Sequence, residues 1–205
     1  MKRYILLALL WTAWCTLHSA LISGRVMARM KECHRDRMRY FRIIYNTVSL
    51  LTIVPVILYS ATLRTSPFFT WSGAWRLPQV LLVISALALF VSGALHYDLL
   101  QFLGVRQLRE GSSGKGLTQT GGLDVSGILG VVRHPWYTGG MLILWARPLD
   151  PSALVTNLVL TAYLVVGAHL EERKLVEEFG QEYRQYQRQV PMFFPGWGRK
   201  GRGRG

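Results

Sequence analysis

Charged residues are scarce in this chain of 205 amino acids. Asp, Glu, Lys and Arg make up 17% of the residues, whereas a typical soluble domain has about 25%. Hydrophobic residues account for 50% of the chain, and the mean hydropathy is +0.22. This balance argues against a soluble enzyme and against a disordered chain.

Acidic residues and cysteines are also few. Eleven Asp and Glu stand against 24 Lys and Arg, so the net charge is +13. In a soluble protein this excess would suggest nucleic-acid binding, but membrane proteins carry basic loops on their cytoplasmic side. Of the two cysteines, Cys15 lies in an apolar run and Cys33 in a basic loop, so we expect no disulfide framework.

Long apolar runs, in contrast, are abundant. A helix that crosses a bilayer needs roughly 20 apolar residues. Four runs reach that length: Tyr4–Ser23, Ile43–Leu63, Leu77–Tyr97 and Pro151–Leu170. A further segment, Val125–Ala146, is interrupted by Arg133-His134-Pro135, so it either dips into the membrane or places this tripeptide below the surface. The sequence predicts an all-α, polytopic membrane helix bundle with about five transmembrane helices and a cytoplasmic amphipathic C-terminal helix.

The distribution of basic residues predicts the orientation. The loop Arg25–Arg42, the loop 104–133 and the C-terminal tail hold 19 of the 24 Lys and Arg. The positive-inside rule then places the N-terminus outside and the C-terminus in the cytoplasm, with a bacterial inner membrane as the expected location. The start Met1-Lys2-Arg3 followed by an apolar run also resembles a signal peptide, but the run exceeds the usual ~7–15 residues.

The interrupted segment carries the first group of candidate functional residues. Pro135 suits the first position of a helix, and His134 before it is disfavoured in helical conformation. We therefore expect Gly127–His134 to be a loop that feeds a helix N-terminus, whose free N–H groups suit a carboxylate. Arg133 adds a cation there, although a helix start with a snorkelling arginine explains the same pattern.

An acidic pair forms the second group. Glu171-Glu172 follow the last apolar run directly, where a carboxylate is costly unless it is paired. Either Arg133 or the cation of a bound ligand could pair with it. Apolar residues then recur at helical spacing and by themselves predict an interfacial helix: Leu175, Val176, Phe179, Tyr183, Tyr186 and Val190.

Other polar groups lie at the ends of the apolar runs. Asp98 is a functional candidate by default, with Arg106 or Arg109 as partners. A metal site would have to draw on His96, Asp98, His134 and His169. Their spacing matches no recognised ligand set, so we expect no metal.

The motifs together resemble a known family. Arg133-His134-Pro135, Tyr137 and Gly139 are followed in order by Glu171-Glu172, Leu175, Phe179-Gly180, Tyr183, Tyr186, Val190-Pro191 and Pro195. This pattern resembles the integral-membrane methyltransferases of the isoprenylcysteine carboxyl methyltransferase and phospholipid methyltransferase type. Looser features, including Leu17-His18-Ser19 and His96-Tyr97-Asp98, are most similar to the methanethiol S-methyltransferase and NnrU-like branch.

The resemblance implies an S-adenosylmethionine pocket that faces the cytoplasm. The implied roles are Gly127 and Leu129 lining the adenosine, Arg133, His134 and Tyr137 holding the methionyl end, Glu171 and Glu172 binding the ammonium, and Tyr183 and Tyr186 closing the pocket. Ile128-Leu129 replaces the Pro-Tyr often found in the family, and Gly167 stands where isoprenylcysteine enzymes commonly carry Arg.

The implied activity is methyl transfer from S-adenosylmethionine to a small or membrane-soluble acceptor, with a thiol favoured. A thiol needs a base or a cationic neighbour to ionise, and His18, His96 and His134 remain open for this role, with Asp98 orienting or accepting. The expected catalytic set is therefore Arg133, His134, Asp98 and His18.

The implied organisation has three parts: a membrane region over 1–103, a methyltransferase core over 104–195 and a basic Gly-rich tail over 196–205. Expected partners are the lipid bilayer and the methyl acceptor, without nucleic acid. Alternatives are a non-enzymatic NnrU-like accessory protein of a respiratory or denitrification pathway, and a prenylcysteine or phospholipid methyltransferase. The related RHPNYxGE motif of NADPH-dependent sterol reductases fits less well, because Trp136 and Gly140 depart from it.

Overall fold

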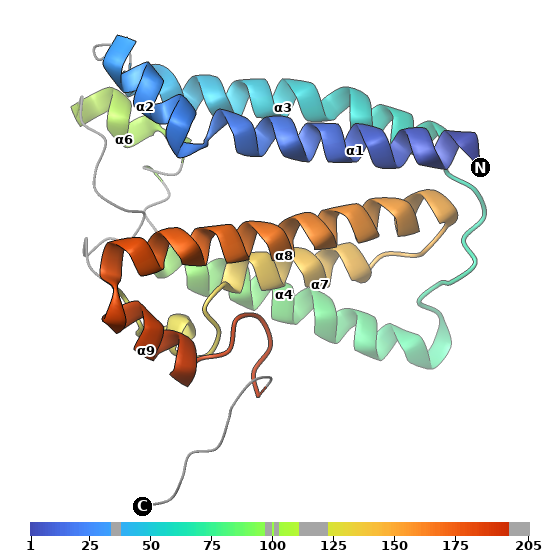
Figure 1. Ribbon diagram of the computed structural model, residues 1–205. Coiled ribbons are helices and arrows are strands. Elements are labelled where there is room, and N and C mark those ends of the chain that lie inside the picture. Colours follow the sequence, from blue (N-terminus) through green and yellow to red (C-terminus); the bar gives the residue numbers. More distant parts are fainter. Residues whose placement is uncertain (34–37, 97–99, 101–102, 111–122, 197–205) are drawn as a thin grey trace, which may run out of the picture. The chain divides into compact units, whose positions relative to one another are not determined.

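The computed structural model describes residues 1–33, 38–96, 100, 103–110 and 123–196, and helices dominate this part of the chain (Figure 1). The elements are α1 (Lys2–Leu21), α2 (Gly24–Cys33), α3 (Met38–Thr62), η2 (Gly73–Trp75), α4 (Arg76–His96), α6 (Val105–Glu110), η3 (Gly127–Gly130), α7 (Pro135–Trp145), α8 (Pro151–Phe179) and α9 (Gln181–Gln189). Over the described ranges there is no β-strand, only an isolated bridge between Phe69 and Leu149. The all-α fold class is confirmed.

Four of the described helices are long and apolar enough to cross a membrane: α1, α3, α4 together with η2, and α8. They coincide with the four long apolar runs, so this prediction is confirmed. Helix α7 has 11 residues and is therefore about 16 Å long. Because a hydrocarbon core is ~30 Å thick, α7 does not span it alone, and the predicted fifth crossing is a short helix.

The structure divides into two compact units that are interleaved along the chain. The first unit comprises 1–70, 98–117 and 148–160, and the second comprises 71–97, 118–147 and 161–205. Helix α8 therefore contributes its first residues to one unit and the remainder to the other. The three-part division expected from the sequence groups residues by their expected role, whereas the two units group them by packing. The three-part division therefore stays a prediction.

In the first unit, α1 and α3 pack side by side (Figure 1). Leu7 and Trp11 from α1 meet Val56 and Leu63 in its buried core. The indole Nε1 of Trp11 donates a hydrogen bond to Ser60 Oγ at 3.1 Å, so the polar edge of this buried ring is satisfied. Apolar packing and a few interhelical hydrogen bonds hold this pair of helices together, as is usual in membranes.

Asp150 fixes the start of α8. Its Oδ1 accepts hydrogen bonds from Ser152 Oγ at 2.7 Å and from the backbone N–H of Ala153 at 2.8 Å, which is an N-cap arrangement. Desolvation opposes ionisation of this carboxyl, but these hydrogen bonds outweigh it and lower the pKa of Asp150. The cap explains why the helix begins at Pro151, which has no N–H to satisfy.

In the second unit, α4 and α7 pack closely because glycines line their contact. A Cβ on Gly93 would lie 2.4 Å from Nε1 of Trp136, and one on Gly139 would lie 3.2 Å from the Ala86 carbonyl oxygen. The Trp136 indole crosses this space and donates to the Phe90 carbonyl at 3.1 Å. Small residues that let helix backbones approach are typical of membrane helix pairs.

The C-terminal amphipathic segment differs from the single helix expected over 175–190. Helix α8 ends at Phe179, Gly180 adopts φ +58, and α9 starts at Gln181. Glycine tolerates this left-handed conformation, so the chain turns there and the helical register is broken. The expectation of an interfacial apolar face is also corrected, because this face packs on the chain's own residues in one cluster: Tyr183, Tyr186 and Val190 with Leu123, Leu175, Val176 and Phe179.

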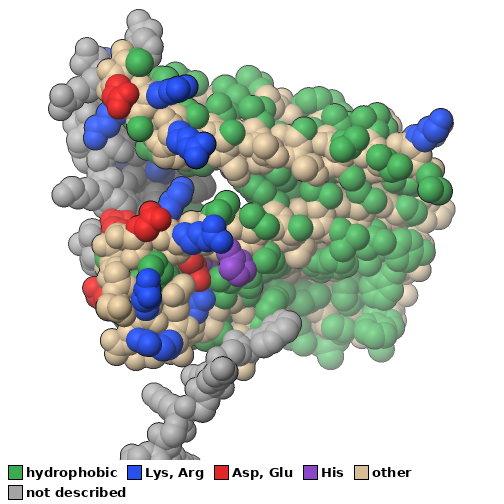
Figure 2. Space-filling model, in the orientation of Figure 1, with side chains coloured by type: hydrophobic (Ala, Val, Ile, Leu, Met, Phe, Trp, Pro, Cys, Tyr) green, Lys and Arg blue, Asp and Glu red, His purple; other side chains and the backbone are tan. Residues whose placement is uncertain are grey.

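Charged and hydrophobic side chains are segregated on the surface (Figure 2). On the face shown, hydrophobic side chains cover most of the long helices, whereas most Lys, Arg, Asp and Glu side chains gather around α2 and around α9. Apolar side chains exposed on long helices are suited to a lipid environment, which keeps them out of contact with water. The chain is thus built as an integral membrane protein.

Candidate functional site

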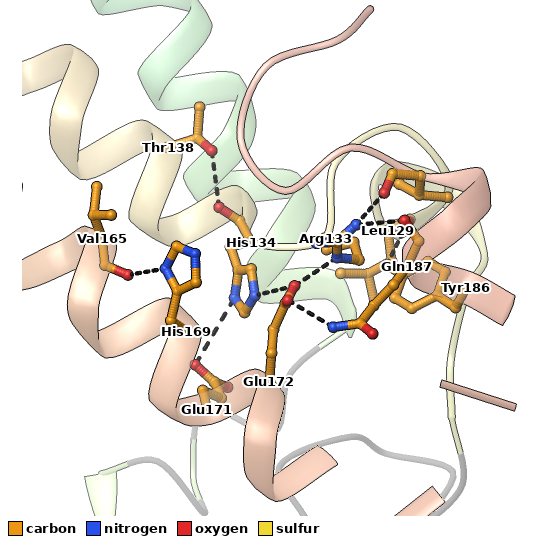
Figure 3. A network of polar contacts seen from close by, with 11 residues as sticks. Leu129, Arg133, His134, Thr138, Val165, His169, Glu171, Glu172, Tyr186 and Gln187 are labelled. Carbon is orange, nitrogen blue, oxygen red and sulfur yellow. Dashed lines mark hydrogen bonds and ion pairs between the residues drawn. The ribbon is translucent and has the colours of Figure 1, made fainter. Parts of the chain in front are cut away.

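The site is built around the turn that precedes α7, in the second unit. Pro135 occupies the first turn of α7 and His134 takes φ −125 and ψ 69, outside the helical region, as a residue before proline should. The short helix η3 leads into this turn. The chain therefore leaves helical geometry at His134, and the side chains of Arg133 and His134 lie beside Glu171 and Glu172 of α8 (Figure 3).

Arg133 and Glu172 form a buried ion pair. Arg133 Nε donates to Glu172 Oε1 at 2.6 Å, and each side chain is 8% exposed. A charge-assisted contact of this length in a low-dielectric setting is among the stronger polar interactions of proteins. Of the two partners that the sequence left open for the acidic pair, Arg133 is the one in contact with Glu172.

Both oxygens of Glu172 are occupied by this chain. His134 Nε2 lies 3.2 Å from Oε1, and Gln187 Nε2 donates to Oε2 at 2.8 Å (Figure 3). The carboxylate thus joins the turn before α7 to α9. This arrangement makes Glu172 an organiser of Arg133, His134 and Gln187.

The other side of the Arg133 guanidinium holds the end of α9. Nη1 donates to the Gln187 carbonyl at 3.0 Å and makes a second, shorter contact with the Val190 carbonyl. The last carbonyls of a helix have no intrahelical partner, and a cation is favoured beside them. Among the described residues, Nη2 of Arg133 makes no hydrogen bond.

The backbone of the turn departs from what the sequence predicts. Arg133 N–H donates to the Pro191 carbonyl at 3.0 Å, and His134 N–H donates to the Met192 carbonyl at 3.1 Å. Thr138 Oγ1 also lies 3.0 Å from the Phe193 carbonyl. The expectation that these N–H groups are free for a carboxylate is therefore wrong for Arg133 and His134, because the segment after α9 satisfies them.

Glu171 is the more accessible carboxylate of the pair. Its side chain is 39% exposed, and Oε2 lies 3.8 Å from His134 Nδ1. His134 itself is buried and its ring packs edge-on against Tyr137, with centroids 5.3 Å apart. The two neighbouring glutamates thus differ, because Glu172 is engaged in contacts with the chain and Glu171 is accessible to solvent.

Tyr186 anchors α9 to η3, and Tyr183 is buried beside it. Tyr186 Oη donates to the Leu129 carbonyl at 2.6 Å, and Tyr183 is 1% exposed. Burial, reinforced by the nearby Glu172 carboxylate, raises the pKa of Tyr183, so its hydroxyl stays neutral. The predicted role of these two tyrosines in closing a pocket stays a prediction.

The sequence of this chain is similar to known proteins. The family model described as "NnrU protein" matches residues 6–192. The chain belongs to the NnrU family. Among curated relatives, methanethiol S-methyltransferases of Pseudomonas deceptionensis and of Crocosphaera subtropica (strain ATCC 51142 / BH68) are each 46% identical, over 66 and 70 residues. These alignments cover 32% and 34% of this chain, and 25% and 28% of those proteins.

A longer alignment extends over most of the chain. The methanethiol S-methyltransferase of Mycobacterium tuberculosis (strain ATCC 25618 / H37Rv) is 29% identical over 154 residues, which is 73% of this chain and 63% of that protein. The chain thus spans about a quarter of the first curated relatives it matches and under two thirds of this one. No solved structure is significantly similar to it.

His18 and Asp98 are the other two residues predicted to be catalytic in this NnrU-family protein. His18 belongs to the first unit, where Nε2 lies 2.7 Å from Tyr45 Oη and Nδ1 lies 3.0 Å from Ser49 Oγ. Asp98 falls outside the described residues. Their catalytic roles stay predictions. Tyr137 lies against Gly167, because a Cβ on Gly167 would be 3.4 Å from Cε1 of the Tyr137 ring. Isoprenylcysteine enzymes commonly carry Arg at the position of Gly167, and here the Tyr137 ring occupies the space beside that position.

Sequence reasoning missed two features of the site. One is Gln187, which hydrogen-bonds Glu172 from α9 although no motif marks it. The other is the closeness of His96 and Gly127: a Cβ on Gly127 would lie 2.6 Å from Nε2 of His96. Gly127 itself is a signal for the second feature, since a glycine lets another group approach the backbone closely.

Proposed function

We propose that this NnrU-family membrane protein is an S-adenosylmethionine-dependent methyltransferase that acts on a small or membrane-soluble thiol. The names of the curated relatives support methyl transfer to a thiol. The observation that carries the proposal to this chain is the Arg133–Glu172 pair at the turn before α7, with Glu171 exposed beside it. This places one cation and two carboxylates within one small network.

The residues present fit the amino-acid end of such a donor. That end carries an ammonium and a carboxylate. Glu171 offers an exposed carboxylate for the ammonium, and the unused Nη2 of Arg133 offers a donor for the carboxylate. The backbone of Gly127 and Leu129 would line the adenosine. When bound, S-adenosylmethionine supplies an electrophilic methyl group on a sulfonium.

The chain itself contributes by orienting the groups of the site and by excluding water from it. Glu172 holds Arg133 and His134 in fixed orientations, which keeps the donors of the site from reorganising when a ligand arrives. Helices α4 and α7 pack on each other and consist mainly of apolar residues, which would exclude water from a donor bound at the start of α7. Exclusion of water favours a step in which a sulfonium and a thiolate lose their charges together, and alignment of the reacting atoms supplies much of the rate.

Calorimetry tests the binding half of the proposal. Purified protein in detergent is titrated with S-adenosylhomocysteine, the demethylated product, and Glu171→Gln is compared with wild type. We expect binding by wild type and at least tenfold weaker binding by the variant, because loss of a charged hydrogen bond costs about 1.5–3 kcal/mol. Glu177→Gln, at an exposed position of the same helix, is the matched control.

Mass spectrometry tests the transfer half. Wild type is incubated with methyl-labelled S-adenosylmethionine and ethanethiol, and the labelled thioether is measured. Label found in a lipid amine or a prenylcysteine ester instead would show that the methyl acceptor belongs to that class and is not a small thiol. A folded protein that neither binds S-adenosylhomocysteine nor transfers label would overturn the proposal and favour a non-enzymatic accessory role.

A further inference from the structure

His96 at the end of α4 has a defined tautomer. Its Nδ1 lies 2.8 Å from the Ser92 carbonyl oxygen. A carbonyl oxygen accepts hydrogen bonds only, so Nδ1 must carry the proton, and the neutral ring presents an unprotonated Nε2. Among the described residues, Nε2 makes no hydrogen bond. The helix thus fixes the ring and leaves its basic nitrogen available.

Nε2 faces the backbone of Gly127. A Cβ on Gly127 would lie 2.6 Å from Nε2 and 2.8 Å from Cε1, so a side chain at this position would displace the ring. Gly127 also adopts φ +52, which disfavours other residues. The basic edge of His96 therefore lies against η3, the same turn whose backbone is proposed to line the donor and which leads directly to Arg133.

Asp124 stands on the same side of this turn. Its Oδ1 accepts hydrogen bonds from Ser126 N–H at 2.9 Å and from Ser126 Oγ at 2.7 Å. Desolvation opposes ionisation of Asp124, but these hydrogen bonds and the charge of His96 lower its pKa. The elements packed against α4, namely η2, η3 and α7, carry no charged side chain. Asp124 is thus a described carboxylate whose charge interacts with His96.

We propose that His96 is the catalytic base that takes the proton of the acceptor thiol, an inference that rests on the proposed methyl transfer. The S–H bond breaks, a bond forms between the proton and Nε2, and the electron pair stays on sulfur as a thiolate. The proton is later released to water. A thiol has an unperturbed pKa near 8.5, so a base is needed at neutral pH. His134 is less suited, because its Nε2 already faces Glu172.

His96→Asn removes the base and keeps its anchor. The asparagine amide nitrogen replaces Nδ1 and can still donate to Ser92, whereas nothing replaces Nε2. His169→Asn is the matched control, because His169 makes the same contact to Val165 at 2.8 Å and its ring is exposed. We expect His96→Asn to lower kcat/KM for ethanethiol at pH 7 by about 10²–10⁴-fold, a general-base effect, and His169→Asn to leave it unchanged.

An acceptor thiol that is already ionised distinguishes a general-base role of His96 from a structural role. With 4-nitrothiophenol, an acidic aryl thiol that is mostly thiolate at pH 7, we expect His96→Asn to approach wild-type kcat/KM. With ethanethiol, the deficit of the variant should shrink as the pH rises toward the pKa of the thiol. S-adenosylhomocysteine binding, measured by calorimetry, should be the same in wild type and in both variants.

A spectroscopic measurement needs no turnover and no variant. Ethanethiol is added to wild type saturated with S-adenosylhomocysteine, below the pKa of the free thiol, and thiolate absorbance in the ultraviolet is recorded. We expect thiolate to form on the protein. Absence of this band, or an equal loss of activity with both acceptors in His96→Asn, overturns the role of His96. If wild type binds no S-adenosylhomocysteine and transfers no methyl group, the proposed function itself has failed, which is a different result.

Discussion

At the scale of single residues, the adjacent glutamates after the last long apolar stretch divide two tasks. Glu172 is buried and gives both oxygens to Arg133, His134 and Gln187. Glu171 is 39% exposed and has one distant neighbour in His134. A buried carboxylate with both oxygens in hydrogen bonds to the chain stabilises the fold, whereas an exposed one is available for a cation. Sequence alone treats the two as equivalent.

This division predicts different effects on stability. Glu172→Gln leaves the Arg133 guanidinium buried without a counter-charge, which should cost about 3–5 kcal/mol of unfolding free energy. Glu171→Gln should change stability by less than about 0.5 kcal/mol, as is usual at exposed positions. Unfolding in detergent with increasing denaturant measures both. Equal stabilities of the two variants would contradict the division of tasks.

The Arg133–Glu172 contact could be anticipated from the sequence, but Gln187 could not. A cation before a proline and a carboxylate at the edge of an apolar run each need a partner, and few candidates exist at that depth. Gln187 reaches Glu172 only because the chain turns at Gly180, and the pattern of apolar residues does not show that turn. The contacts of Arg133 with the Gln187 and Pro191 carbonyls are invisible to motifs, because every residue carries a carbonyl.

At the scale of elements, the break between α8 and α9 is what closes the network. An uninterrupted helix from Pro151 to Gln189 would carry Gln187 about 22 Å beyond Glu172, at 1.5 Å per residue. The positive φ of Gly180 redirects α9, so that Gln187 Nε2 reaches Glu172. The apolar residues of α9 then pack on Leu175, Val176 and Phe179 of α8.

Gly180→Ala tests this dependence. A Cβ at Gly180 meets no atom within 4 Å, so the change adds no clash and acts through the left-handed backbone alone. We expect a loss of about 1 kcal/mol or more of unfolding free energy and weaker S-adenosylhomocysteine binding, because α9 shifts against Glu172. Gly24→Ala is the matched control, since it is equally open and has no positive φ. A Gly180→Ala protein as stable as this control would show that the turn does not need glycine.

At the scale of the whole molecule, the spanning helices follow from hydropathy because the bilayer leaves few alternatives. Within hydrocarbon every backbone group must be satisfied in its own segment, so a long apolar run becomes a helix. Helix α7 is less predictable, because it is short and its N-terminal side is held by the segment 191–193 through hydrogen bonds that hydropathy does not report. The division into interleaved units likewise depends on packing between segments far apart in sequence.

The orientation in the membrane is a proposal that Cys33 can test. Cys33 is exposed and lies in the basic segment that the positive-inside rule assigns to the cytoplasm, whereas Cys15 is buried. With the protein expressed in a bacterial inner membrane, a membrane-impermeant maleimide should label inverted vesicles and leave intact spheroplasts unlabelled. Cys33→Ser should abolish the labelling. Labelling of spheroplasts would reverse the orientation and move the Arg133–Glu172 site away from cytoplasmic S-adenosylmethionine, because the charge distribution assigns α2 and the end of α8 to the same compartment.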